Sequence, residues 1–397
     1  MTDQELIYTM ALTRLMPFNA SQQRTLLNEV GSATAVFENR RDLGRMMEHF
    51  SPRAAEVLAG MESELGRCEQ ELAYARVHKI KVLALADETA YPSRLRQCDD
   101  APLVLYQLGV ADLNARHIIS VVGTRRCTER GRDLCNNLAA DLARLLPDTL
   151  VVSGLAYGID IAAHRAALAN HLPTVGVLAH GLDEIYPRLH RQTAIEMLQQ
   201  GGLLTEFMSH TQIEKVNFVQ RNRIVAGLAD ATVVIETPDR GGSLITAEMA
   251  NGYNREVCTF PGRPTDAASS GCNHLIRRQG AHLVTSAEDI LADLGWQAVS
   301  QPDGQGVMDF ASAADATGAT APAQPSGNSA SAASLLVAAP EEQSIVAALQ
   351  ASGGDLSLSD LIVKTGLPVA QLTSFLLPLE MKGVIRKLAG NKYHLIH

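Results

Sequence analysis

Six short apolar segments, each followed by a stretch with helical periodicity, fill the middle of this 397-residue chain. They are rich in β-branched residues, and most lack the alternation of polar and apolar side chains that marks a half-exposed strand. Strands of this kind are buried on both faces, because helices cover both sides of a parallel sheet. The segments span residues 118–122, 150–153, 174–179, 202–207, 231–236 and 257–260.

This alternation predicts an α/β fold with a Rossmann-like, doubly wound and mostly parallel sheet over residues 66–296. Two earlier segments, 81–85 and 103–109, are expected to add a strand or two to that sheet. Residues 1–65 instead carry short amphipathic periods, which predict a small helical, SAM-like domain. Its helices are expected near residues 4–15, 20–30, 34–37, 42–49 and 53–61, with Ser51 capping the last of them.

The composition changes sharply after the predicted sheet. Residues 297–340 contain no Lys or Arg and are dominated by Ala, Ser, Gly, Pro and Gln. Such a segment has too little branched or aromatic surface to offset the entropy of ordering the chain. We therefore expect a flexible linker there.

The tail, residues 341–397, predicts a winged-helix domain. Three helical periods are followed by two strands around Gly390. The third period has no Lys or Arg between residues 368 and 381, so protein interaction or packing is favoured over DNA reading. Contacts to phosphate remain open for three cations of the wing, Arg386, Lys387 and Lys392. The helices are expected at 342–350, from Ser357 or Ser359 to 365, and at 368–382.

Charge and cysteine usage limit the possible partners. The formal net charge is −9, which argues against a protein coated in basic surface but allows a local basic groove. The six cysteines show no CxxC or metal spacing, and no run of about eighteen apolar residues suggests a membrane span. The N-terminus lacks the basic region of a signal peptide. A cytoplasmic protein without membrane or metal is expected.

Glycine-containing loops follow three of the predicted strands. Because ligands bind at the carboxyl edge of open α/β sheets, these loops are candidates for holding an anion. None matches GxGxxG or the Walker pattern, so neither an NAD nor an ATP cofactor site is supported. Glycine after a strand is also how ordinary tight turns are made, so each loop alone decides little. The candidates are Gly123, Thr124 and Arg125, then Ser153 and Gly154, then Gly241, Gly242 and Ser243.

The segment from Asn217 to Leu228 combines cations with an aromatic residue. Phe218 lies between Lys215 and two arginines, Arg221 and Arg223, without an acidic residue among them. Cations for phosphates and a ring for a base are the minimal chemistry of single-stranded nucleic-acid binding. An ordinary solvated helix start with one buried Phe fits the segment equally well. The apolar second half predicts that the cationic end is exposed and the other end buried.

These motifs together resemble the DNA-processing protein A (DprA/Smf) family. The resemblance is carried by GTRR, SGLAYGIDIAAHRAAL, GLDEIYPRLHRQ, NFVQRNRIVAGLADATVVIE, GGSLITAEMA and the late GCNHLIRRQGA. It implies a cytosolic, non-enzymatic homodimer, formed through the Rossmann-like domain, that protects incoming single-stranded DNA during natural transformation. It also implies loading of the RecA recombinase onto that DNA.

The resemblance further implies roles for individual residues. Gly123, Thr124 and Arg125 would contact phosphate, and Ser153 with Gly154 would form the second motif. Lys215 would grip the backbone, Phe218 would stack on a base, and Arg221 with Arg223 would form a basic wall. The implied single-stranded DNA site also includes Asn222, Gly241, Gly242 and Ser243.

The chain also departs from the family pattern. Thr124 replaces the commoner serine, and Tyr157 stands where many members carry a basic residue. The N-terminal bundle lacks the usual Gly-x-Gly hairpin, which favours a structural or docking role for that region over DNA contact.

An alternative is a nucleotide-cleaving enzyme of the LOG type. Gly241, Gly242 and Glu248 fit the spacing of its GGxGTxxE loop. Leu244 and Ile245, however, stand where that motif has Gly and Thr, so a capping or solvated Glu248 is preferred to a catalytic one. A transcription factor is disfavoured by the nearly uncharged third helix of the tail.

Overall fold

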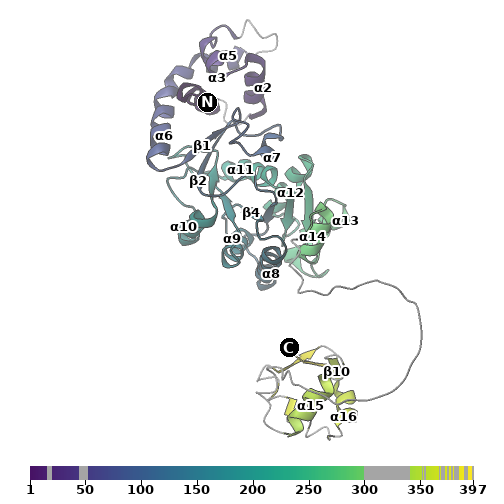
Figure 1. Ribbon diagram of the computed structural model, residues 1–397. Coiled ribbons are helices and arrows are strands. Elements are labelled where there is room, and N and C mark those ends of the chain that lie inside the picture. Colours follow the sequence, from purple (N-terminus) through teal and green to yellow (C-terminus); the bar gives the residue numbers. More distant parts are fainter. Residues whose placement is uncertain are drawn as a thin grey trace, which may run out of the picture. The chain divides into compact units, whose positions relative to one another are not determined.

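The computed structural model describes residues 1–15, 20–43 and 52–298 of the chain (Figure 1). It also describes part of the C-terminal region, namely residues 340–350, 352, 355–365, 367, 372, 375–376, 379, 384–388 and 392–395. The chain forms two compact units, Met1–Gly306 and Val307–His397. The predicted linker 297–340, the helix 42–49, the Ser51 cap and the third tail helix fall wholly or largely outside the described residues.

Within the described part of the first unit, nine strands form one sheet in the order β1-β2-β6-β5-β4-β3-β7-β8-β9. Strands β3 to β9 pair with one another in parallel, whereas β2 is antiparallel to both β1 and β6. The predicted doubly wound, mostly parallel sheet is confirmed. The strands are β1 Lys81–Ala84, β2 Val104–Gly109, β3 Ile118–Val122, β4 Leu150–Ser153, β5 Thr174–Val177, β6 Gly202–Thr205, β7 Ala231–Val234, β8 Glu256–Thr259 and β9 His282–Leu283.

Strand β3 lies at the point where the winding of the sheet reverses. The chain runs outward from β3 through β4 and β5 to β6, and then returns to β7 on the other side of β3. Ile119 of β3 pairs with Val151 of β4 on one side and with Ala231 of β7 on the other. The loops after these three strands therefore leave the same carboxyl edge, which is where open α/β sheets bind ligands.

Alternate residues of β3 enter different cores, one on each face of the sheet. Ile118 and Val122 belong to a cluster with Ile224 and Ala247, from helices α11 (Lys215–Leu228) and α12 (Gly242–Gly252). Ile119 and Val121 belong to a cluster with residues of α8 (Glu129–Leu145), α9 (Ile159–Ala169) and α14 (Ala287–Leu294). Helices thus cover both faces of β3. The remaining helices beside the sheet are α7 Ser93–Arg96, η2 Arg188–His190, α10 Arg191–Gln200, η3 Ala267–Ser269 and α13 Ser270–Arg277.

The N-terminal helices gather at the β1–β2 end of the sheet (Figure 1). Their core contains Met10 and Leu58, and it continues into Tyr106 of β2. They therefore belong to the same compact unit as the sheet. The helices are α1 Asp3–Leu15, α2 Ala20–Val30, α3 Ala33–Glu38, α5 Pro52–Ala59, η1 Met61–Glu64 and α6 Leu65–Val77.

The second unit contains two described helices and a small antiparallel sheet of order β10-β12-β11. Its core includes Ile345 and Leu361, one from each of these helices, and Tyr393 from the sheet. The predicted hairpin is confirmed, and β10 is an additional strand that pairs with it. The elements are α15 Pro340–Gln350, β10 Asp355–Ser357, α16 Leu358–Thr365, β11 Ile385–Leu388 and β12 Lys392–Leu395.

Candidate functional site

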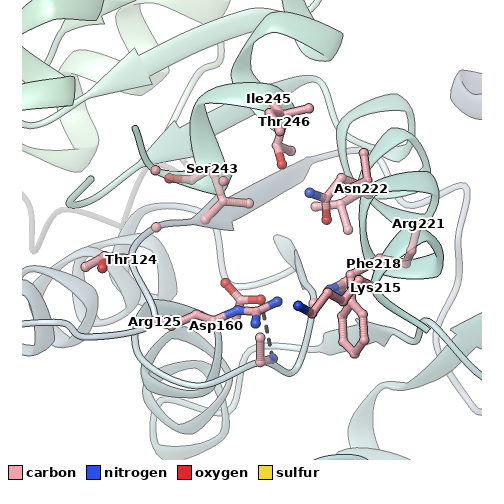
Figure 2. Close-up of a pocket in the computed structure, with 18 of the residues that line it drawn as sticks. Thr124, Arg125, Asp160, Lys215, Phe218, Arg221, Asn222, Ser243, Ile245 and Thr246 are labelled. Carbon is pink, nitrogen blue, oxygen red and sulfur yellow. Dashed lines mark hydrogen bonds between the residues drawn. The ribbon is translucent and has the colours of Figure 1, made fainter. Parts of the chain in front are cut away.

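A pocket of about 640 Å³ opens at the carboxyl edge of the sheet, beside the end of β3 (Figure 2). This volume lies within the range that small-ligand sites occupy in proteins. The loops after β3, β4 and β7 and the helices α11 and α12 provide most of its wall. Of the predicted site residues, it brings together Gly123, Thr124, Arg125, Gly154, Lys215, Phe218, Arg221, Asn222, Gly241, Gly242 and Ser243.

The loop after β3 is fixed to its neighbours by backbone hydrogen bonds. The amide of Thr124 donates to the carbonyl of Glu236 over 2.7 Å, and the carbonyl of Thr124 accepts from the amide of Ile159 over 3.1 Å. A Cβ on Gly123 would collide with the Ile159 side chain and the Glu236 backbone, so this close approach requires glycine. Arg125 follows this tight turn and is exposed at the pocket.

The carboxylate of Glu236 anchors the end of the same loop through two hydrogen bonds. It accepts from the amide of Thr128 at 2.8 Å and from its hydroxyl at 2.7 Å. The Thr128 hydroxyl in turn caps α8 by accepting from the amide of Gly131. The end of β7 and the start of α8 are thereby tied together, so the loop that carries Arg125 has a rigid base.

Helix α11 presents Lys215 and Phe218 on the opposite wall (Figure 2). Lys215 is exposed and Phe218 is half-buried. The Cζ atom of Arg125 lies 5.4 Å from the centre of the Phe218 ring, within reach of a cation–π interaction. The pocket therefore combines an aromatic ring with a cation from the β3 loop and a cation from α11.

Three exposed cations line the pocket and form no ion pair with any described residue, namely Arg125, Arg126 and Lys215. Two acidic residues, Asp160 and Glu214, line it as well. Many other arginines in the described part of the chain are paired, as Arg94 is with Asp230 at 2.6 Å. Unpaired, exposed cations around a pocket favour an anionic ligand.

The loop after β7 supplies the third wall. The amide of Gly241 donates to the carbonyl of Pro238 over 2.9 Å, and the hydroxyl of Ser243 donates to that of Thr237 over 2.7 Å. Helix α12 begins at Gly242, so its first amides lie at the pocket, where an anion is favoured. Ile245 also lines the pocket, whereas Glu248 is exposed and is not among the lining residues.

Arg221 differs from the expectation that it forms an exposed basic wall. Its side chain is buried beneath the pocket, with 3% of the residue exposed, and Nη1 donates to the carbonyl of Val177 over 2.6 Å. Burial lowers the pKa of this guanidinium to about 10, against the opposing effect of Asp160. The prediction was wrong because the local sequence of α11 does not show that this arginine has a partner in the backbone at the end of β5.

Arg223 and Ser153 do not reach the pocket. Residues two apart on a helix point in different directions, so Arg223 turns away from Arg221. It forms a buried ion pair with Glu206 and donates to the carbonyl of Asp100 over 2.6 Å. Ser153 is fully buried, and its hydroxyl donates to the carbonyl of Val121 over 2.6 Å. The expected position of both residues in the site is wrong.

Asp160 and Tyr186 are among the pocket residues that were not predicted as site residues from the sequence. Asp160 is buried, accepts from the amide of Ala156 at 3.4 Å, and lies near Arg125 and Arg221. Burial raises the pKa of this carboxyl despite those arginines. Tyr186, in the loop after β5, lines the pocket and remains exposed. The sequence signal for Tyr186 is its place before a proline in the GLDEIYPRLHRQ motif, to which no site role was assigned.

The described residues contain no group of three or more His, Cys, Asp and Glu side chains that could hold a metal ion. None of the described helices is long and apolar enough to cross a bilayer.

Two family models match the chain. One, described as DNA recombination-mediator protein A, matches residues 82–295, and a DprA winged helix domain model matches residues 320–391. A putative DNA processing protein DprA of Mycobacterium tuberculosis is 44% identical over 216 residues, which is 54% of this chain and 55% of that protein. The match thus spans about half the length of this relative.

The DNA processing protein DprA of Streptococcus pneumoniae is 40% identical over 206 residues, covering 52% of this chain and 72% of that protein. The X-ray structure of DprA from the same organism matches with a TM-score of 0.62 and 32% identity, over 74% of this chain and 98% of that one. Because the first family model covers more than half of the chain, this protein belongs to the DNA recombination-mediator protein A family, the DNA-processing proteins named DprA or Smf.

Proposed function

We propose that this protein binds single-stranded DNA in the pocket beside β3. In this proposal a base stacks on Phe218, and Arg125 and Lys215 hold neighbouring phosphates. The observation that carries it is that the Phe218 ring lines a pocket of about 640 Å³ together with Arg125, whose Cζ atom lies 5.4 Å from the ring centre, and Lys215. A ring of this kind gives roughly 1 to 3 kcal/mol per stacked base, whatever the sequence.

The resting position of Arg125 fits this role. Its Cζ atom lies 5.4 Å from the ring centre. A base inserted between them needs about 3.5 to 4 Å of separation on each side. Binding of a base therefore requires Arg125 to swing aside, and the guanidinium then becomes available for a phosphate.

Because the net charge is −9, DNA binding in this proposal is confined to the pocket. The rest of the surface repels DNA on average, so affinity depends on the few cations at the pocket. The amides at the start of α12 add donors without adding charge.

The wider role that we propose is that of a recombination mediator. A cytoplasmic homodimer, formed through the Rossmann-like domain, would protect incoming single strands during natural transformation and load the RecA recombinase onto them. Family membership supports this role, as does the winged-helix match in the tail. We propose no catalytic residue, because Glu248 of the alternative, nucleotide-cleaving motif is outside the pocket lining.

The test is a binding titration of the full-length protein with labelled single-stranded and duplex DNA of the same sequence, each at two salt concentrations. Single strands are expected to bind more tightly at both, because the bases of a duplex are not available for stacking. Equal affinity for both forms would contradict the proposal. Adding purified RecA and its nucleotide then tests loading, since a mediator shortens the lag before RecA filaments form on DNA that is covered by single-strand-binding protein.

A further inference from the structure

We propose that Tyr186 is a second base-contacting residue of this site, held in position by His180. Phe218 and Tyr186 then each stack on one of two neighbouring bases, and the planes of these two bases are inclined to each other. This inference rests on the proposed single-stranded DNA binding and adds a residue that the chain's motifs do not assign.

Tyr186 is exposed, as Tyr157 is, whereas the other aromatic side chains whose burial the structure describes are buried or half-buried. It lines the same pocket as Phe218, and 45% of it remains accessible to solvent. The centres of the two rings are 6.0 Å apart. A large ring kept at the rim of a cationic pocket offers a base the same apolar surface as Phe218 does.

The loop that carries Tyr186 is fixed by a buried histidine. His180 is fully buried, and its Nδ1 lies 2.8 Å from the carbonyl of Gly181. Because a carbonyl only accepts, Nδ1 carries the hydrogen, and Nε2 is left to accept from the amide of Tyr186 at 3.3 Å. The neutral imidazole thus bridges both ends of the turn.

A second set of bonds holds His180 and its turn against the end of β6. The hydroxyl of Thr205 donates to the carbonyl of His180 over 2.8 Å. The carboxylate of Asp183 accepts from the amide of His210 at 3.0 Å. A Cβ on Gly181 would meet the backbone of Met208, so the turn lies directly on that segment. The position of Tyr186 is therefore set by the fold before any DNA binds.

The angle between the rings determines what they bind. The planes of Tyr186 and Phe218 are inclined by 65°, so no single flat base stacks on both. Each ring takes its own base, and the strand must turn between them. A flexible single strand makes that turn, whereas neighbouring bases of a duplex stay parallel. The site thereby selects single strands by geometry as well as by access to the bases.

The test measures the contribution of the bases separately from that of the backbone. The probes are a thymidine oligonucleotide and an abasic oligomer of the same length, both titrated against the full-length protein. The affinity for the thymidine oligonucleotide divided by that for the abasic oligomer measures the contribution of base contacts. Tyr186→Ala is expected to lower this ratio about fivefold to a hundredfold, the equivalent of one lost stacked base. Tyr186→Phe should retain the ratio, and the affinity for the abasic oligomer should change in neither variant.

Phe218→Ala separates this inference from the proposed function. If Phe218→Ala lowers the ratio and Tyr186→Ala leaves it unchanged, the proposed function stands and the second contact is refuted. If neither the natural protein nor any variant binds the thymidine oligonucleotide more tightly than the abasic one, base stacking itself is refuted.

A matched pair of variants tests the positioning role of His180. The amide of Gln places its oxygen near the position of Nε2, so His180→Gln should keep the bond to the Tyr186 amide and the affinity ratio. The amide of Asn reaches only the position of Nδ1, so His180→Asn should keep the bond to Gly181 and lose the bond to the Tyr186 amide. Its affinity ratio should therefore fall as that of Tyr186→Ala does. Equal ratios in both variants would contradict the role of His180, and the affinity for the abasic oligomer verifies that each variant is folded.

Discussion

The guanidinium of Arg221 occupies the space that a side chain at position 154 would need. A Cβ built on Gly154 would collide with Nη1, Nη2 and Cζ of that arginine. The same Nη1 donates to the carbonyl of Val177 over 2.6 Å. The glycine after β4 is therefore required by a side chain from α11, 67 residues later by their numbers, and not by a left-handed backbone.

Gly154→Ala is expected to destabilise the protein. The added methyl must displace a buried guanidinium from its hydrogen bond, and overpacking of this kind costs about 1 to 3 kcal/mol. Gly242→Ala is the matched control, because a Cβ there meets nothing within 4 Å. Urea unfolding followed by the fluorescence of the single tryptophan, Trp296, measures both. Equal stability of the two variants would mean that Arg221 moves aside without cost.

Arg125→Ala and Phe218→Ala should weaken single-stranded DNA binding in different ways. Removing Arg125 removes a phosphate contact, so the slope of log affinity against log salt should flatten by about 0.7. Removing Phe218 removes a stacking surface but no charge, so affinity should fall at an unchanged slope. Titrations at four salt concentrations separate the two effects. Identical slopes for both variants would contradict the assignment of Arg125 to phosphate.

The buried strands could be predicted because each is a short run of apolar, mostly β-branched residues in the sequence. The predicted starts of β3, β4, β5, β6 and β7 coincide with those of the structure, and most predicted ends run slightly too far into the loops. Strand β9 was missed, because His282 and Leu283 are exposed and make no apolar run. Local pattern thus defines buried strands and overlooks a short edge strand that depends on its neighbour for pairing.

Those parts of the pocket could be predicted in which a glycine follows a strand or a cation stands near an aromatic residue in the sequence. The positions of the arginines were not, because their partners come from distant parts of the chain. Arg221 meets the backbone of Val177, and Arg223 meets Glu206. Tyr186 was missed for a related reason. Only the fold brings its loop beside Phe218, and the hydrogen bonds that hold this loop, among them that of His180, join it to other segments.

Arg223→Ala and Lys215→Ala should separate stability from DNA binding within one helix. The side chains of Arg223 and Glu206 are only 7% and 11% exposed, and removing the arginine leaves a buried carboxylate. Breaking a buried pair in this way costs about 3 to 5 kcal/mol. Lys215 is exposed, so its removal should leave stability unchanged and flatten the salt dependence by about 0.7. A stable Arg223→Ala variant with weakened DNA binding would place Arg223 in the site after all.

The two bonds of Thr174 fix the protonation of His164 and predict a loss of stability in acid. The Thr174 hydroxyl donates to the carbonyl of Val151 over 2.9 Å, so it accepts from Nδ1 of His164 at 2.7 Å. Nε2 is buried and has no partner among the described residues. A proton there would place a charge in the core, so burial, with Arg221 and His190 adding to it, lowers the pKa of His164 to about 3.

Because the folded-state pKa lies below the value of 6.5 in the unfolded chain, the unfolded state takes up the proton first as pH falls. The contribution of His164 to stability is complete above pH 6.5 and is lost progressively down to about pH 3. One group accounts for about 1.4 kcal/mol per pH unit in that window. In His164→Asn the amide donates to Thr174 without titrating, so its unfolding free energy should fall about 1.4 kcal/mol less than that of the natural protein between pH 7.5 and 5.5. Urea unfolding at the two pH values measures this difference, and parallel losses in both proteins would show that His164 is not the group responsible.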